Sequence, residues 1–242
     1  MTGSLLRVED LVKVYSGKPV VDHVDIALDR REIVGLLGPN GAGKTTTFYL
    51  IVGLLRPDEG KVFLDDQDVT DDPVYLRARK GINYLAQEPS VFRKLTVEEN
   101  LLAILETLPI SADERKVRLK ELLDELNIGH LAKQRASSLS GGERRRLEIT
   151  RSLVTEPRFM LLDEPFAGID PMVLSDIQQI VRQLKDRGLG IIISDHNVRE
   201  TLNVCDRAYI INEGRILEQG PPEHIVKSEV ARSIYLGEDF CL

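Results

Sequence analysis

Short apolar runs that alternate with helically spaced apolar residues indicate an α/β protein. The run 32–37 is almost continuously apolar, as expected of a strand covered on both faces. A helical spacing follows it, at Leu50, Ile51, Leu54 and Leu55. Strand-like runs return at 159–162 and 191–193. Alternating strands and helices predict a mostly parallel sheet.

The N-terminal segment has a different pattern, typical of an antiparallel hairpin. Two stretches with β-branched and apolar residues, 6–15 and 20–28, flank the turn-prone sequence Ser-Gly-Lys-Pro at 16–19. We expect this hairpin to form an N-terminal antiparallel β subdomain that closes one end of the fold.

The middle of the chain, 89–155, is expected to be an inserted helical subdomain. Thr96 and Glu99 have the spacing of a capping box. Apolar residues then keep helical spacing at Leu101, Leu102, Leu105 and Leu108, and again at Leu119, Leu122, Leu123 and Leu126. A later helix is predicted to begin at Asp170 and Pro171 and to stop before Gly188.

These patterns predict one domain over 1–242. Its core would combine 1–88 and 156–212, with the helical subdomain inserted between them and a C-terminal tail at 213–242.

Composition narrows the class of protein. The formal net charge of −7 argues against a general nucleic-acid-binding surface. Two cysteines without metal-ligand spacing, Cys205 and Cys241, indicate reduced thiols in the cytosol, with Cys205 buried. No apolar run approaches the roughly 18 residues that span a bilayer, and residues 1–10 lack a signal pattern. Any membrane role is therefore expected to come through a partner.

Residues 38–45 match a phosphate-binding loop, which leaves a buried strand and opens a helix. Its glycines let backbone N–H groups face phosphates, Lys44 adds positive charge at the β and γ positions, and Thr45 is placed to bind Mg²⁺. A glycine-rich turn that only starts a helix would not need Lys and Thr at these offsets. The residues expected to contact the bound nucleotide are Gly38, Pro39, Asn40, Gly41, Ala42, Gly43, Lys44, Thr45 and Thr46.

Asp163 and Glu164 end a hydrophobic strand, so they are expected at the carboxyl edge of the sheet, where ligands bind. Asp163 would hold Mg²⁺, directly or through water. Glu164 would act as general base or orient the attacking water. Without the upstream loop, the same acids would be interpreted as solvated turn residues.

Ser140 and Glu143 have the spacing of a second capping box. The two glycines between them, Gly141 and Gly142, each cost a helical turn about 1 kcal/mol relative to Ala. Because these glycines are costly, we expect them to be there so that another group can come close. That group could be an anion bound by the exposed backbone N–H groups. A solvated helix face is expected for the next three residues, Arg144, Arg145 and Arg146.

In content and order, these motifs resemble those of the ATP-binding cassette ATPases. The resemblance covers essentially the whole chain and adds Gln87 after a strand, Asp170, and His196 after a strand. Glu143 departs from the family, which usually has Gln there, although both fit the capping geometry.

The resemblance implies roles for individual residues. Gln87 would sense Mg²⁺ and a membrane partner, and His196 would contact the γ-phosphate. The implied catalytic set is Lys44, Gln87, Glu164 and His196. Tyr15 stands where the family places an aromatic residue against adenine, although from sequence alone such a residue is more often a core aromatic.

The resemblance also implies a head-to-tail homodimer. Asp170 would belong to the loop that crosses its interface. The second chain would contact ATP through Ser140, Gly141, Gly142 and Glu143.

Three segments are similar, more narrowly, to the ATPase subunits of bacterial lipopolysaccharide-export transporters: 195–201 (DHNVRET), 140–146 (SGGERRR) and the tail 235–240 (YLGEDF). This similarity implies a cytoplasmic subunit, peripheral on the inner membrane, that powers lipopolysaccharide extraction through two transmembrane subunits. The alternatives are the ATPase of a branched-chain amino-acid importer and a soluble cassette ATPase acting on DNA or ribosomes.

Residues 88–94 are expected to form a groove for a helix of the transmembrane partner. Phe92 and Arg93 would make the contact, because an aromatic anchor beside Arg is typical of interface hot spots. The alternative is that Phe92 is a local core residue.

Overall fold

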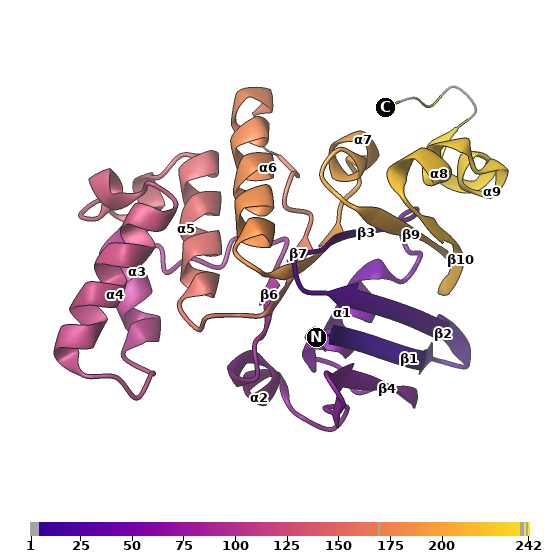
Figure 1. Cartoon of the computed structure of the whole chain (residues 1–242), viewed down its shortest axis with the longest axis horizontal. Coiled ribbons are helices and arrows are strands. Elements are labelled where there is room, and N and C mark those ends of the chain that lie inside the picture. Colours follow the sequence, from indigo (N-terminus) through magenta and orange to yellow (C-terminus); the bar gives the residue numbers. More distant parts are fainter. Residues whose placement is uncertain (1–4, 169, 238–239, 241) are drawn as a thin grey trace.

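The computed structural model describes residues 5–168, 170–237, 240 and 242, which form two sheets with helices around them (Figure 1). The smaller, antiparallel sheet has the order β2-β1-β4-β5. Its strands are β1 (Leu5–Tyr15), β2 (Lys18–Asp29), β4 (Glu59–Leu64) and β5 (Gln67–Asp68). Tyr15 pairs with Lys18, so Ser16 and Gly17 form a two-residue turn, both with positive φ. The predicted hairpin is confirmed.

The larger sheet has the order β10-β9-β3-β8-β7-β6. Its strands are β3 (Ile33–Leu37), β6 (Ile82–Leu85), β7 (Phe159–Asp163), β8 (Gly190–Ser194), β9 (Arg207–Asn212) and β10 (Arg215–Gly220). Every neighbouring pair is parallel except β9 and β10. The mostly parallel sheet is therefore confirmed, and it aligns the carboxyl ends of β3, β7 and β8.

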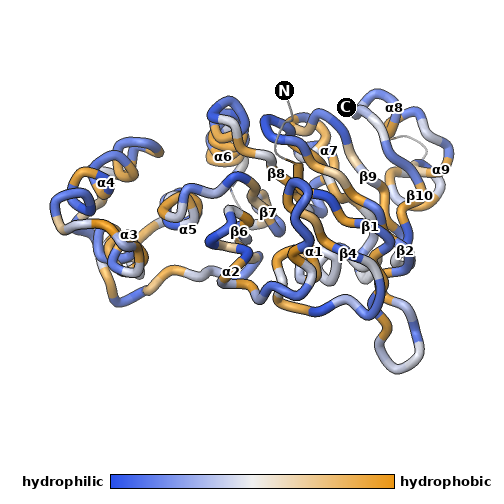
Figure 2. The backbone as a smooth tube through the Cα atoms, turned by 60° about the horizontal axis from the view of Figure 1, so that its bottom comes forward, coloured by the Kyte–Doolittle hydropathy of each residue, from blue (hydrophilic) through white to orange (hydrophobic). Residues whose placement is uncertain are grey.

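Both faces of this sheet are buried, which explains its continuous apolar runs. Val34 and Leu36 belong to a cluster shared with α1 (Lys44–Val52) and the antiparallel sheet. Ile33 and Leu37 belong to a second cluster, shared with the other helices except α2. In Figure 2 apolar segments lie along the strands of both sheets.

The second cluster gathers helices from most of the chain. They are α3 (Val97–Leu105), α4 (Ala112–Glu125), α5 (Gly141–Leu153), α6 (Pro171–Asp186), α7 (Val198–Leu202), α8 (Pro222–Lys227) and α9 (Glu229–Ala231). A short helix, α2 (Val74–Arg79), precedes β6. Three-residue 3₁₀ turns lie at Gly129–Leu131 and Ala136–Ser138, and a π-helical turn lies at Arg232–Leu236.

Two helices, α1 and α3, end earlier than the apolar spacing in the sequence predicted. α1 stops at Val52 because Gly53 adopts φ 80° and caps it, so Leu54 and Leu55 lie beyond the helix. α3 stops at Leu105, and Leu108 precedes Pro109, which disfavours helical backbone at the residue before it. The capping box at Thr96 is confirmed.

Between β6 and β7 the chain forms helices and turns, with one isolated antiparallel bridge between Thr96 and Arg135. Figure 1 shows α3 and α4 at the end of the molecule farthest from β10. Within the described residues, no helix has both the length and the apolar character needed to cross a bilayer.

Candidate functional site

The loop from β3 to α1 is held between the two sheets. Gly43 has φ 105°, and a Cβ there would lie 2.5 Å from the carbonyl oxygen of Val20 on β2, so only glycine fits. Lys44 Nζ donates hydrogen bonds to the carbonyls of Gly38, at 2.7 Å, and Pro39, at 3.0 Å. Burial lowers the pKa of Lys44, while nearby carboxylates, Glu164 first, act in the opposite direction. The loop thus presents a cation at a helix N-terminus, as phosphate binding requires.

Asp163 ends β7 beside this loop, and only 3% of its surface is exposed. Tyr84 Oη donates a hydrogen bond of 3.0 Å to Asp163 Oδ2. Burial raises the pKa of Asp163, whereas hydrogen bonds from Tyr84 and the side chain of Thr45 lower it. A hydroxyl and a carboxylate therefore meet where the loop meets the sheet. Such oxygen donors fit Mg²⁺, which takes one or two carboxylates together with phosphates and waters.

Glu164 brings together three residues that are far apart in sequence. Its backbone has φ 46° and its N–H donates to the carbonyl of Ser194 at 2.6 Å, which turns the chain sharply after β7. Gln87 Nε2 donates to Glu164 Oε2 at 2.8 Å, and His196 Nδ1 lies 3.3 Å from the same oxygen. A carboxylate flanked in this way, next to a phosphate-binding loop, can orient a water molecule for attack.

Asp195 supports this arrangement and was not singled out from the sequence. It is fully buried, and its carboxylate accepts backbone N–H bonds of 2.8 Å from Phe166 and Asn197. Burial raises the pKa of Asp195, and those two bonds act in the opposite direction. The carboxylate thus joins the turn after β7 to the turn after β8, from which His196 projects. Its signal in the sequence is an acid directly after a buried strand.

The start of α5 carries the predicted capping box, with reciprocal bonds between Ser140 and Glu143. The two glycines differ. A Cβ on Gly142 would lie 2.4 Å from Val173 Cγ1 of α6, so close helix packing explains this glycine and the anion hypothesis is not needed for it. Gly141 is exposed, and a Cβ there would meet no atom within 4 Å. The first turn of α5 is therefore accessible at Gly141 to a group from another molecule.

A family model described as "ABC transporter" matches residues 21–167. The chain belongs to this family. It is 53% identical, over 236 residues and 98% of each chain, to the lipopolysaccharide export system ATP-binding protein LptB of Acidithiobacillus ferridurans. It is 52% identical, over 99% of this chain and 100% of the relative, to the protein of that name from Haemophilus influenzae. A solved ATP-binding cassette of an ABC transporter, in its ADP conformation, has a TM-score of 0.87 at 30% identity, covering 97% of this chain and 99% of that one.

The predicted family and fold class are confirmed, and the chain is an ATP-binding ABC ATPase. Its nucleotide loop, Asp163, Glu164, Gln87 and His196 converge on one edge of the larger sheet, as the motif order implied.

The solvated face expected of the three arginines in this ABC ATPase is wrong for Arg145. Only 7% of Arg145 is exposed, and it bonds to the carbonyl of Ala86 at 3.2 Å, to that of Asp163 at 3.3 Å and to the Glu148 carboxylate at 3.1 Å. Glu148 in turn accepts the Ser90 N–H at 3.0 Å. α5 is therefore fastened to β7 and to the segment that carries Gln87. A run of arginines is most often solvated, which is why the sequence pattern did not predict these contacts. Arg145 lies on the face of α5 that points into the protein.

For Tyr15 and Phe92 the sequence left open that the side chain is buried in the core, and the structure excludes this for both residues. Tyr15 is 45% exposed at the tip of the hairpin, with Lys13 Nζ 5.8 Å from its ring centre. Phe92 is 46% exposed and lies 5.1 Å from the Arg151 guanidinium. Asp170 is also exposed.

Cys205 is buried, as predicted, and burial raises the pKa of its thiol to about 12. Cys241, like residues 238–239 of the tail motif, lies outside the described residues. Tyr235, Leu236 and Phe240 pack against the second apolar cluster.

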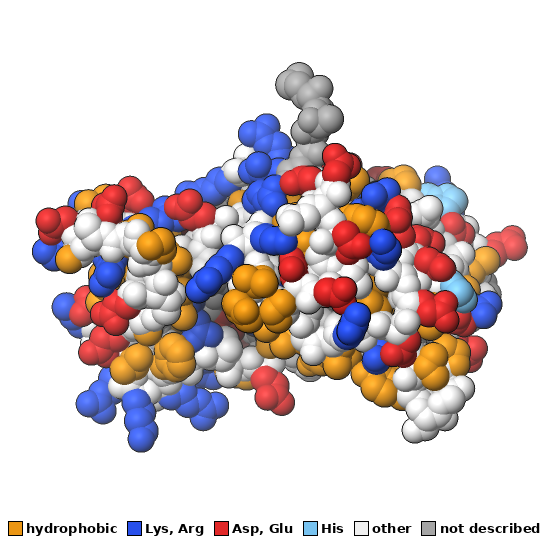
Figure 3. Space-filling view, turned by 90° about the horizontal axis from the view of Figure 1, so that it is seen from below, with side chains coloured by type: hydrophobic (Ala, Val, Ile, Leu, Met, Phe, Trp, Pro, Cys, Tyr) orange, Lys and Arg blue, Asp and Glu red, His pale blue; other side chains and the backbone are white. Residues whose placement is uncertain are grey.

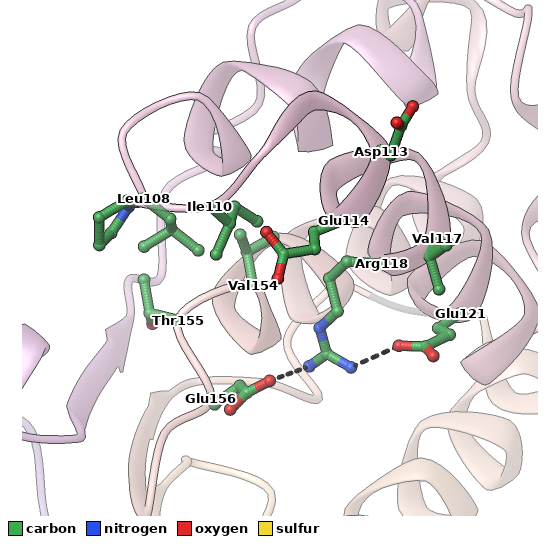
Figure 4. A pocket seen from close by; sticks show the side chains of 11 residues that line it. Leu108, Ile110, Asp113, Glu114, Val117, Arg118, Glu121, Val154, Thr155 and Glu156 are labelled. Carbon is green, nitrogen blue, oxygen red and sulfur yellow. Dashed lines mark hydrogen bonds and ion pairs between the residues drawn. The ribbon is translucent and has the colours of Figure 1, made fainter.

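A separate hollow of about 640 Å³ lies in the helical region (Figure 4). Arg118 crosses it to bond with Glu121 at 3.2 Å and Glu156 at 3.3 Å. None of the motif residues lines it, so it is not the nucleotide site.

Proposed function

We propose that this ABC ATPase is the ATP-hydrolysing subunit of a lipopolysaccharide exporter. It would work at the cytoplasmic face of the inner membrane, held there by transmembrane partner subunits. The observation that carries the proposal is identity above 50%, over nearly the full length of both chains, to relatives named for lipopolysaccharide export.

ATP would be bound by residues 38–46, with Tyr15 against adenine. Thr45 and Asp163 would hold Mg²⁺, with Gln87 next to them. The ion, when bound, supplies positive charge that neutralises the phosphate oxygens. Glu164 would orient the attacking water, assisted by the amide of Gln87 at 2.8 Å and by His196 at 3.3 Å, and His196 would contact the γ-phosphate.

Two copies would form a head-to-tail dimer. In it, residues 140–143 of one chain face the ATP held by residues 38–45 of the other. Support comes from Ser140 and Gly141, which are exposed at a helix N-terminus with open space around the Gly141 Cα. Two-fold symmetry then gives two identical sites.

The transmembrane partner would dock in a groove of about 410 Å³ beside Phe92. Its apolar lining includes Leu54, Val74 and Ile104, and its polar lining includes Arg151. Figure 3 shows apolar side chains gathered at the centre of one face of the molecule, with Lys and Arg near them. Phe92 and Arg93 would contact the partner helix. Residues 89–155 would act as a subdomain that turns against the core, 1–88 and 156–212, with 213–242 as a tail.

The direct test is to purify the tagged chain from membranes and identify the transmembrane chains that accompany it. We expect two transmembrane subunits whose reconstitution with this chain gives ATP-dependent release of lipopolysaccharide from vesicles. A Lys44→Ala chain is the matched control, since it should assemble without releasing substrate. Recovery of amino-acid permease subunits instead would replace the proposal by the branched-chain importer alternative.

A further inference from the structure

Tyr84 is the one residue of β6 whose side chain touches both the Asp163 carboxylate and the groove beside Phe92. β6 is the edge strand of the larger sheet, and Tyr84 pairs with Leu161 on β7, two residues before Asp163. Tyr84 is half-buried; the residue lines the groove, and its hydroxyl lies at the Asp163 carboxylate.

The hydroxyl end of Tyr84 acts on the orientation of Asp163. The hydrogen bond of 3.0 Å uses Oδ2 of a carboxylate that is 3% exposed, so little water competes for this oxygen. A hydrogen bond to one oxygen of a metal-binding carboxylate fixes the direction in which the other oxygen points. Such outer contacts commonly change metal affinity by about 10- to 100-fold.

The ring end of Tyr84 packs on α1. The ring meets that of Tyr49 edge-on at 5.9 Å and that of Phe48 edge-on at 6.4 Å. α1 begins with Lys44 and Thr45, so the helix that carries the nucleotide ligands and the wall of the groove share this aromatic contact. A side chain that enters the groove would press on the same ring.

We propose that Tyr84 is a positioning residue for the Mg²⁺-binding carboxylate of Asp163, and that it transmits occupancy of the partner groove to that carboxylate. The inference rests on the functions proposed above for Asp163 and for the groove. It differs from the role of Gln87, because Gln87 bonds to Glu164 whereas Tyr84 bonds to Asp163. The two carboxylates therefore have separate connections to the partner side of the molecule.

The first test compares Tyr84→Phe with Tyr75→Phe in the full chain. Tyr75 is 58% exposed on α2, so its variant loses a hydroxyl without touching Asp163. A non-hydrolysable ATP analogue is bound in EDTA, and Mg²⁺ is then titrated while binding is followed by calorimetry. Tyr84→Phe should weaken Mg²⁺ binding about 10- to 100-fold. Its affinity for the analogue in EDTA, and both properties in Tyr75→Phe, should match wild type. Wild-type Mg²⁺ binding in Tyr84→Phe would overturn the positioning role.

An Asp163→Asn chain separates failure of this inference from failure of the proposed function. Loss of Mg²⁺ binding in Asp163→Asn with wild-type binding in Tyr84→Phe would sink the inference alone. Wild-type Mg²⁺ binding in both variants would also remove Asp163 from the metal site.

The second test repeats the Mg²⁺ titration on the chain assembled with its transmembrane subunits. Assembly should tighten Mg²⁺ binding several-fold in wild type and leave it unchanged in Tyr84→Phe. An equal shift in both, or no shift in wild type, would contradict transmission through Tyr84.

Discussion

Gln87 and Glu164, which are 77 positions apart in sequence, are joined by a hydrogen bond of 2.8 Å. Gln87 follows the edge strand β6, directly before the segment that contains Phe92, while Glu164 follows β7. A change in the backbone of the Gln87 segment therefore alters the amide that orients the Glu164 carboxylate. In the assembly proposed above, this contact would connect partner binding near Phe92 to water activation at Glu164.

Replacement of Glu164 by Gln should keep ATP binding and nearly abolish turnover. Gln preserves shape and hydrogen bonding but lacks the negative charge that orients and polarises water, so kcat should fall by at least about 10²-fold. An ATP-bound dimer should accumulate, which size-exclusion chromatography with light scattering would detect. Hydrolysis within a few-fold of wild type would remove Glu164 from this role.

A mixture of Lys44→Ala and Ser140→Arg chains should regain part of the ATPase activity that each lacks alone. In a head-to-tail heterodimer both lesions fall on one shared site and the other site is intact. Heterodimer formation is checked with two affinity tags. If heterodimers form and stay inactive, ATP is not shared between residues 38–45 and 140–143.

Replacement of Phe92 by Ala should leave the isolated chain folded and able to hydrolyse ATP while assembly with the transmembrane subunits weakens. The ring is 46% exposed, so its loss creates no core cavity, whereas truncation of an aromatic interface anchor commonly costs about 2 kcal/mol or more. Tyr75→Ala is the control, since that ring is also exposed but does not line the groove. Normal assembly and transport by Phe92→Ala would exclude it from the interface.

Replacement of Arg145 by Ala should destabilise the chain by about 3–5 kcal/mol, because it leaves the buried Glu148 carboxylate without its cation. Arg144→Ala, which removes a single bond to the Leu139 carbonyl, should cost less than about 1.5 kcal/mol. Urea unfolding measures both changes. The double replacement Arg145→Met, Glu148→Met should recover most of the loss. Equal stability of the two single variants would contradict the anchoring role of Arg145.

Replacement of Asp163 by Asn should stabilise the metal-free chain near neutral pH. Burial raises the pKa of Asp163 in the folded state, so the folded chain binds the proton more tightly than the unfolded chain does. That contribution to stability is complete below the unfolded pKa and is lost as pH rises through the folded pKa. The Asn variant escapes the loss, so its gain in Tm over wild type in EDTA should shrink as pH falls through the folded pKa of Asp163 and vanish below the unfolded pKa of about 4. A gain that grows on acidification would contradict a raised pKa of Asp163 in the folded chain.

The fold could be predicted where local pattern and tertiary burial agree. The runs at β3, β7 and β8 are apolar because both sheet faces are covered, and the capping boxes at Thr96 and Ser140 are local signals. β10 was missed because its burial alternates between exposed and half-buried residues, which leaves no apolar run.

The site could be predicted only as far as each residue stands in a motif. Tyr84, Arg145 and Asp195 act through contacts with residues far away in the sequence, at Asp163, Ala86 and Phe166 respectively. Their roles depend on which strands become neighbours, and no local spacing encodes that.

The supports of the phosphate-binding loop come from both ends of the chain. Gly214 donates its N–H to the carbonyl of Ala42 and accepts the N–H of Asp22, while β3 lies between β8 and β9. During synthesis the loop emerges early, but its contacts with residues 190–214 wait roughly 10–30 s at ordinary translation rates. A nascent chain cut short before β9 lacks them, so the ability to bind nucleotide should arise only after residue 214 has been synthesised. Nucleotide binding would thus become possible only after a segment far along the chain from the loop has been made.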